Sequence, residues 1–365
     1  MKMKIILVAG ARPNFMKIAP IIRALKHRNE NTLVWKLVHT GQHYDHTMSQ
    51  TFFDDLGIPE PDYFFEAGSG THAEQTSKIM IAFEELCEKE MPDVVLVVGD
   101  VNSTLACSIV AKKQNIKVAH VEAGLRSFDL TMPEEINRMV TDSITDYFFT
   151  TEKVANENLI REGKPEGQIH FVGHVMIDNL LYQKEKLEEE MTSDFSVSEL
   201  KAGLDNYIFL TLHRPATVDN RENLSDVVNA LNRIAKETVI IFPVHPRTKK
   251  MIDTFELELS DNIIQLEPLG FKESLFLWKD AVMVLTDSGG LQEETTGLGI
   301  PCYTVRENTE RPVTITEGTN TLIGTSGKAI WDAYRSFMSG NVKKGTVPKL
   351  WDGKSAERIV DVLLK

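Results

Sequence analysis

The sequence contains little cysteine. Its 365 residues include only Cys87, Cys107 and Cys302, which lie far apart and inside apolar stretches. A disulfide framework or a zinc site needs closely spaced cysteines, so the sequence predicts neither. We expect three small buried side chains and no metal site.

Long hydrophobic runs are also missing. No apolar stretch approaches the roughly 18 residues that cross a bilayer. The apolar run near the N-terminus stops at Gly10, and no cleavage signal follows it. We therefore expect a cytoplasmic protein with no membrane partner, whose first apolar run is a strand and not a signal peptide.

Positive charge is the third shortage. The 40 Lys and Arg residues stand against 53 Asp and Glu residues, which gives a formal net charge of −13. Such a surface repels phosphate backbones on average, so no nucleic-acid partner is expected. A site for an anionic substrate would have to gather its cations locally.

What the sequence does contain is a repeated alternation of short apolar runs with segments of helical period. Continuous apolar runs are typical of strands buried on both faces, and their alternation with helices indicates a parallel sheet. At 365 residues the chain has room for about two domains. We predict an α/β protein of two doubly wound, Rossmann-like domains facing a cleft. The expected strands are 5–9, 33–39, 94–98, 118–121, 147–150, 169–172, 208–212, 239–244, 263–266, 282–286 and 301–305.

A charged segment, 184–190, and a polar segment, 191–199, interrupt this alternation and form the best linker candidate. We place the N-terminal domain at residues 1–173 and the C-terminal domain at 174–352. The last residues, 355–364, have helical spacing and can pack on either domain.

The first candidate binding turn is GARPNFMK, which follows the first strand and opens a helix. Backbone N–H groups at a helix start favour anions, and Arg12 and Lys17 add positive charge. The turn suits a diphosphate, although a capped turn with two solvated cations is an equal alternative. With a single glycine it is neither a P-loop nor a dinucleotide fingerprint.

Three carboxylates follow strands or open a helix in the first domain. Asp100 lies in VGDVNST, Glu122 in HVEAGLR, and Glu134 in PEEINR. Each taken singly has an ordinary structural explanation as a helix cap or a first-turn acid. All three leave the same edge of the expected sheet, however, so we expect them to face one cleft, where crowded carboxylates serve as acid and base.

Two histidines end successive strands of the second domain, His213 in TLHRP and His245 in PVHPR. Such a histidine is poised to donate to a phosphate or a leaving oxygen. A lone histidine is more often structural, but two histidine–arginine motifs in a row favour a site.

The segment TDSGGLQEE follows a buried strand and opens a helix. Amides of Ser288, Gly289 and Gly290 can approach a phosphate closely, because glycine has no side chain to obstruct it. Glu294 lies one helical turn further on, where a carboxylate suits a ribose diol. A tight turn is the alternative explanation of the paired glycines.

Together these stretches resemble the UDP-N-acetylglucosamine 2-epimerases of the non-hydrolysing type. The matching segments are GARPNFMKIAP, TGQHYD, VVGDVNST, HVEAGLRS, PEEINR, TLHRP with NREN, PVHPR, TDSGGLQEE and TERP, in order from residue 10 to residue 312. The resemblance implies the two-domain glycosyltransferase-B fold. It also implies that the C-terminal helix, 353–365, returns to the first domain and that the nucleotide binds mainly on the second.

The resemblance also implies roles for individual residues. Asp100, Glu122 and Glu134 match carboxylates implicated in proton transfer, and His213 matches a histidine near the diphosphate. The implied substrate-binding positions are Arg12, Lys17, His245, Phe271, Ser288, Gly289, Gly290, Glu294 and Arg311. No cofactor is implied; the expected partners are UDP-N-acetylglucosamine, UDP and a second copy of the chain in a homodimer.

The implied reaction is reversible epimerisation at C2, by anti elimination of UDP to 2-acetamidoglucal and re-addition. Three alternatives stay open at this point. One is a hydrolysing enzyme that releases N-acetylmannosamine and UDP. The second is a 2-epimerase of a UDP-2,3-diacetamido uronic acid, and the third is a sugar-nucleotide sensor or retaining glycosyltransferase of the same fold.

Overall fold

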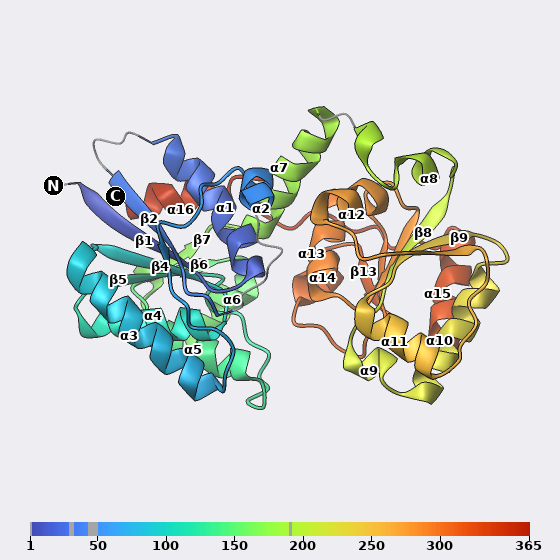
Figure 1. Ribbon diagram of the computed structural model, residues 1–365, viewed down its shortest axis with the longest axis horizontal. Helices are drawn as coiled ribbons and strands as arrows, with labels where there is room; N and C mark the ends of the chain where they lie inside the picture. Colours follow the sequence, from blue (N-terminus) through green and yellow to red (C-terminus); the bar gives the residue numbers. More distant parts are fainter. Residues whose placement is uncertain (1, 29–32, 43–49, 190–191) are drawn as a thin grey trace. The chain divides into compact units, whose positions relative to one another are not determined.

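The chain divides into two compact units, each with its own parallel sheet (Figure 1). The computed structural model describes residues 2–28, 33–42, 50–189 and 192–365. Unit 1 comprises Met1–Leu181 and Lys349–Lys365, and unit 2 comprises Tyr182–Pro348. The first junction therefore lies inside helix α7 (Val175–Glu189), not before it at 173/174 as expected.

Unit 1 is built on a seven-stranded parallel sheet in the order β3-β2-β1-β4-β5-β6-β7. Figure 1 shows helices on both of its faces. The strands are β1 (Met3–Ala9), β2 (Leu33–His39), β3 (Tyr63–Phe64), β4 (Val94–Val98), β5 (Lys117–Val121), β6 (Tyr147–Thr150) and β7 (Ile169–Phe171). The helices are α1 (Arg12–Lys26), α2 (Gln50–Leu56), α3 (His72–Glu90), α4 (Asn102–Lys113), α5 (Pro133–Ile144), α6 (Lys153–Arg161), η1 (Glu166–Gln168), α7 and α16 (Ser355–Leu363).

Unit 2 repeats the plan with six parallel strands in the order β10-β9-β8-β11-β12-β13. The strands are β8 (Tyr207–Thr211), β9 (Val239–Pro243), β10 (Ile263–Leu266), β11 (Met283–Thr286), β12 (Cys302–Thr304) and β13 (Asn320–Leu322). The helices are η2 (Thr192–Asp194), α8 (Ser198–Ala202), α9 (Pro215–Val218), α10 (Arg221–Ile234), α11 (Pro246–Thr254), α12 (Phe271–Trp278), α13 (Gly289–Leu298), α14 (Pro312–Thr316) and α15 (Gly327–Met338).

The strands confirm the prediction from apolar runs. All five residues of β4 are buried, as are Ile5 to Ala9 of β1, because helices cover both faces of the sheet. Two short strands went unpredicted, Tyr63–Phe64 and Asn320–Leu322. Both add to a sheet edge, where a strand needs only one hydrogen-bonded neighbour, and they are only two and three residues long.

The expected linker is partly wrong. Lys184 to Glu189 continues α7, and an ion pair of 3.1 Å between Lys184 and Glu188 supports its last turns. Residues 190 and 191 lie outside the described residues. Helix α16 packs against α1 in unit 1, as the resemblance implied, and Ala356 N donates to Asp178 Oδ2 at 2.7 Å.

The shortages noted in the sequence have structural counterparts. All three cysteines are free and buried, which confirms that prediction. No helix within the described ranges is long and apolar enough to span a membrane. Across the same ranges, no group of three or more His, Cys, Asp or Glu side chains is placed to hold a metal ion.

Strand order fixes where each unit can bind a ligand. The order reverses between β1 and β4 in unit 1 and between β8 and β11 in unit 2. Ligands of open α/β sheets bind beyond the carboxyl ends of the strands at such a switch point. The four segments that follow these strands are GARPNF, GDVNST, HRP and DSGG, and each of them was singled out from sequence.

Candidate active site

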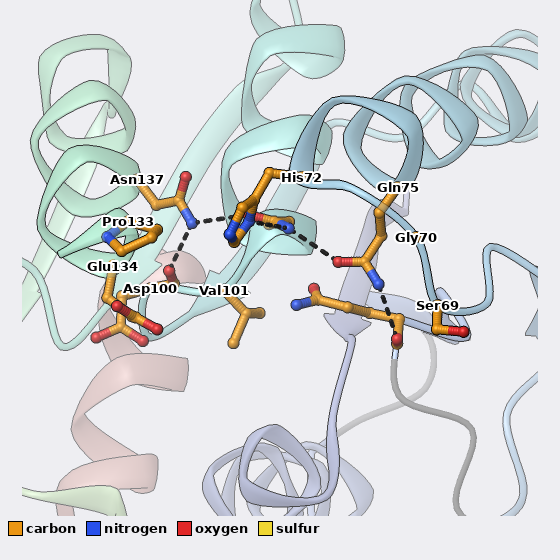
Figure 2. A pocket seen from close by; sticks show the side chains of 11 residues that line it. Ser69, Gly70, His72, Gln75, Asp100, Val101, Pro133, Glu134 and Asn137 are labelled. Carbon is orange, nitrogen blue, oxygen red and sulfur yellow. Dashed lines mark hydrogen bonds between the residues drawn. The ribbon is translucent and has the colours of Figure 1, made fainter.

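Unit 1 contains a pocket of about 310 Å³ at its switch point (Figure 2). Asp100, which follows β4, and Glu134, in the first turn of α5, both line it. Figure 2 shows these two carboxylates at one end of the lining and Ser69 and Gln75 at the other. The lining is completed by Gln42, Gly70, His72, Val101, Asn102, Pro133 and Asn137.

Asp100 is held by helix α5. Its carboxylate forms an ion pair with Arg138, and its backbone carbonyl accepts a hydrogen bond of 2.9 Å from Asn137 Nδ2. The same amide donates to Asn102 Oδ1 at 3.1 Å, and Asn102 in turn donates to Gln75 Oε1 at 2.8 Å. The pocket floor is therefore a connected polar network that fixes the orientation of Asp100.

The two glutamates at the start of α5 have different surroundings. Glu135 is buried and accepts hydrogen bonds from Ser127 N at 2.9 Å and Phe128 N at 3.1 Å. Glu134 is exposed on the pocket wall, and no hydrogen-bond or ion-pair partner is found for it within the described residues. Glu135 holds the preceding loop, whereas Glu134 is available to a ligand.

Glu122 is not among the residues that line this pocket, which contains two of the three expected carboxylates. It is 5% exposed, and its carboxylate forms an ion pair with Lys17. Its backbone has φ +69, a conformation that costs a non-glycine residue on the order of 1 kcal/mol. Gly99, at φ +66, packs beside this pair, and a Cβ there would lie 3.2 Å from Lys17 Nζ.

The turn after β1 differs from its expected role. Asn14 Oδ1 accepts hydrogen bonds from Gly10 N at 3.1 Å and Ala11 N at 3.0 Å, so these amides are not free for a phosphate. Lys17 is engaged with Glu122. Arg12 remains exposed, with its guanidinium 5.3 Å from the centre of the Phe52 ring. Of the expected diphosphate ligands in this turn, only the Arg12 side chain stays accessible.

In unit 2 a buried carboxylate fixes His213. Asp287, fully buried after β11, accepts hydrogen bonds from His213 N at 2.9 Å and Arg214 N at 2.8 Å. Its Oδ1 lies 2.9 Å from His213 Nδ1. Burial opposes ionisation of Asp287, yet its contacts with His213 lower its pKa below the usual value. The arrangement leaves His213 Nε2 as the nitrogen that can face a ligand.

His245 lies beside His213, with ring centres 5.6 Å apart. Its Nδ1 accepts a hydrogen bond from Arg247 N at 3.1 Å and caps α11. Desolvation and the neighbouring His213 lower the pKa of His245. The structure thus places the two predicted histidines together.

The Ser288–Gly290 segment forms the start of α13. Ser288 N donates to Thr286 Oγ1 at 2.9 Å, whereas a Cβ added at Gly290 would meet no atom within 4 Å. Protein packing therefore does not require glycine at 290, and the open space is what close approach of a ligand to the helix start needs. Phe271, half-buried, begins the neighbouring helix α12.

Three arginines crowd the same region of unit 2. Arg306 binds Glu310 with contacts of 2.8 and 3.1 Å, and Arg311 pairs with Glu293 at 2.6 Å. Burial and the charges of Arg306 and Arg311 lower the pKa of Arg214. Glu310, Glu293 and Asp287 balance these three charges, so the six groups together carry no net negative charge, although the whole molecule is acidic.

Glu294 is the most perturbed carboxylic acid near this cluster. Desolvation, together with the neighbouring charge of Glu293, raises the pKa of Glu294 to about 8. At neutral pH its carboxyl group is therefore mostly protonated, and it can donate as well as accept a hydrogen bond.

Unit 2 also contains a pocket of about 900 Å³ lined by residues of α11 and of the segment that ends β10. Neither His213 nor Ser288 lines it, so it does not coincide with the predicted site. Its lining is Val244, Pro246, Lys249, Lys250, Asp253, Thr254, Gln265, Leu266, Glu267 and Pro268.

Sequence reasoning missed three residues that the site depends on: Asp287, Arg138 and Arg214. Asp287 stands in the quoted TDSGG motif and Arg214 in TLHRP, so the motifs contained the signal, but their partners are 73 and 74 residues away. Arg138 follows Glu134 by one helical turn, which is the spacing that would have indicated a shared face.

The two switch-point sites define the class of protein. Two Rossmann-like units with ligand positions at both switch points are the architecture of the glycosyltransferase-B type. A family model described as UDP-N-acetylglucosamine 2-epimerase matches residues 24–364. The chain belongs to the UDP-N-acetylglucosamine 2-epimerase family.

Individual relatives agree with this assignment. A UDP-N-acetylglucosamine 2-epimerase of Methanocaldococcus jannaschii is 44% identical over 99% of both chains, and its structure in complex with UDP-GlcNAc and UDP matches with a TM-score of 0.83, covering 100% of this chain and 99% of that one. The UDP-GlcNAc-bound enzyme of Neisseria meningitidis matches with a TM-score of 0.88 at 29% identity, covering 99% and 100%. A UDP-2,3-diacetamido-2,3-dideoxy-D-glucuronate 2-epimerase of Pseudomonas aeruginosa is 38% identical over the full length of both chains.

Proposed function

We propose that this chain interconverts UDP-N-acetylglucosamine and UDP-N-acetylmannosamine without net hydrolysis. The observation that carries the proposal is the pocket of unit 1, which is lined by two carboxylates, Asp100 and Glu134. An epimerase needs two such groups, since the proton leaves C2 from one face and returns to the other.

The proposed reaction begins with anti elimination. A carboxylate removes the C2 proton, the C–H electron pair forms the C1–C2 double bond of 2-acetamidoglucal, and the C1–O pair leaves with UDP. UDP then adds back to C1 while a carboxylic acid delivers a proton to the opposite face of C2. Unit 1 supplies these carboxylates, with Glu122 acting beside Lys17.

Unit 2 is the proposed UDP-binding part. Negative charge that develops on the departing diphosphate is stabilised by His213, by the arginines near Glu310, and by the amides at the start of α13. His245, Phe271 and Glu294 complete the proposed nucleotide contacts. Arg12 keeps its predicted role as a substrate-binding residue.

A diacetamido uronate is the second candidate substrate, because a named relative acts on one at 38% identity. Its C6 carboxylate would need a cation in the sugar pocket. No lysine or arginine occurs among the described residues that line the pocket of unit 1, and both of its acids are negative when ionised. This favours the neutral N-acetylglucosamine.

Product analysis with both UDP-sugars tests the proposal. Phosphorus NMR of a reaction with UDP-N-acetylglucosamine should show conversion to UDP-N-acetylmannosamine with only traces of free UDP. Net accumulation of UDP would instead identify a hydrolysing enzyme. Conversion of the uronate alone would identify the second candidate.

A further inference from the structure

A buried network lies behind the two turns that carry Asp100 and Glu122. His120, on β5, and Asp142, on α5, are both fully buried. His120 Nδ1 lies 2.7 Å from Asp142 Oδ1, and its Nε2 lies 2.8 Å from the carbonyl oxygen of Gly99, the residue before Asp100. Both oxygens are satisfied when each ring nitrogen carries a proton.

Asp142 reaches the second turn. Its Oδ2 accepts a hydrogen bond of 3.0 Å from Gly124 N, two residues after Glu122, and lies 2.8 Å from Arg126 Nη2. Burial opposes ionisation of Asp142, but the charges of His120 and Arg126 lower its pKa. One imidazole–carboxylate pair therefore connects the two turns.

Both turns have backbone conformations that must be held in place. Gly99, Glu122 and Gly124 all have positive φ, at 66°, 69° and 78°. A strained conformation at Glu122 persists only when surrounding contacts determine it. At Gly124 a Cβ would lie 2.4 Å from the carbonyl oxygen of Ala155, so this turn is also closely packed from behind.

We propose that His120 and Asp142 are positioning residues that fix the turns of Asp100 and Glu122 relative to each other. The inference rests on the proposed function. Neither residue lines the pocket, so each acts through the backbone of Gly99 and Gly124 and not by touching substrate.

The chain offers a matched control for this role. Asp146 follows α5 and accepts a hydrogen bond of 2.7 Å from Val118 N, near the opposite end of the strand that carries His120. Asp142→Asn and Asp146→Asn therefore make the same chemical change at the two ends of β5. Only the first weakens contacts to the turns.

The experiment measures kcat and KM of both variants at a temperature where both are folded by circular dichroism. We expect D142N to lower kcat about 10- to 100-fold with KM within about threefold, because small misplacement of reacting groups has effects of this size. D146N should keep kcat within about twofold. A D142N enzyme with unchanged kcat, or equal kcat losses in both variants, would overturn the proposal.

A second readout does not depend on the reaction. In protein labelled with ¹⁵N-glycine, D142N should accelerate amide hydrogen exchange at Gly99 and Gly124, and D146N should not. If D142N does not fold, H120Q and H120A replace it: glutamine can still donate to the Gly99 carbonyl, so H120Q should exchange more slowly than H120A. Wild-type exchange rates at both glycines in D142N, or equal rates in the two His120 variants, would contradict the positioning role of His120 and Asp142. This readout does not depend on which substrate the enzyme uses.

Discussion

Three of the candidate reactive side chains at the two switch points have a neighbour that fixes them. Arg138 pairs with Asp100, Lys17 pairs with Glu122, and Asp287 binds both the ring and the backbone of His213. A group held in this way loses little further rotamer freedom on reaching the transition state. Glu134 differs, because it lines the pocket with no such partner within the described residues.

Asp287→Asn tests the support of His213. The buried Asp287 carboxylate accepts hydrogen bonds from three donors. Its replacement by an amide should lower the free energy of unfolding by about 2–4 kcal/mol at pH 7. The pKa of Asp287 lies below its usual 3.8. Its contribution is therefore complete above about pH 4 and is lost as the pH falls below that value. Urea unfolding at several pH values should show that the difference in unfolding free energy between wild type and D287N narrows only in acid. A difference that stays constant down to pH 3 would count against a lowered pKa of Asp287.

Glu294→Gln tests the raised pKa of Glu294, which is about 8 against a usual 4.5. Between these values the folded protein holds a proton that the unfolded chain releases, so this group makes wild-type stability fall as pH rises from about 4.5 to about 8. E294Q should show a flatter profile of melting temperature against pH. Glu222→Gln, at an exposed position of α10, serves as the control. Its melting temperature should change with pH as steeply as that of the wild type.

These residue-level pairings explain how far the sequence could predict the site. Asp100, His213 and the Ser288–Gly290 segment could be predicted because they follow buried strands that the apolar runs located, and Glu134 because it follows Pro133 at a helix start. The support from Asp287 and the capping by Asn14 were not found. Each depends on which side chain reaches which atom after folding, and residue spacing alone does not determine that.

At the scale of elements, the helix that follows each central strand places the polar groups. Helices α4 and α13 both begin within a few residues of a buried strand, and their first turns lie at the switch points. Helix α5 supplies Glu134, Asn137 and Arg138 from one face to the same pocket network. The function of these elements therefore depends on where they begin more than on their length.

Gly290→Ala tests the proposed phosphate loop at the start of α13. A methyl group fits there without a protein clash, so we expect stability within about 1 kcal/mol of the wild type. The same methyl group would occupy the space of a bound phosphate, so UDP affinity measured by calorimetry should fall about tenfold or more. Gly167→Ala, at another open position, should change neither quantity; unchanged UDP affinity in G290A would exclude this loop as the phosphate site.

The strands themselves were almost fully predictable, because burial on both faces imposes continuous apolar runs. The charged end of α7 was mistaken for part of a linker. Lys184 and Glu188 lie four residues apart, a spacing that stabilises a helix as readily as it marks a solvated loop.

At the scale of the whole molecule, the chain passes from unit 1 to unit 2 and returns. The last helix, α16, completes unit 1 and packs against α1. Its residues Ile359, Val360 and Leu363 are buried. The predicted homodimer and cytoplasmic location stay predictions, and light scattering of the purified protein would determine the first of them.

Ile359→Ala tests which unit the C-terminal helix stabilises. Ile359 is fully buried, so the change should cost unit 1 about 2–5 kcal/mol. Hydrogen exchange read by mass spectrometry should show faster exchange in α1 and α16, and unchanged exchange in α10 and α15 of unit 2. Equal acceleration in both units would mean that they unfold as a single body.

The net charge of −13 describes the whole molecule, whereas at the candidate site of unit 2 the charges of Arg214, Arg306 and Arg311 are balanced by Asp287, Glu293 and Glu310. The central claim is that acids of unit 1 exchange the C2 proton of a UDP-sugar. Incubation with UDP-N-acetylglucosamine in deuterated water tests it most directly, with proton NMR of the products. The account predicts UDP-N-acetylmannosamine that carries deuterium at C2, and UDP-N-acetylmannosamine that retains its original C2 proton would contradict it.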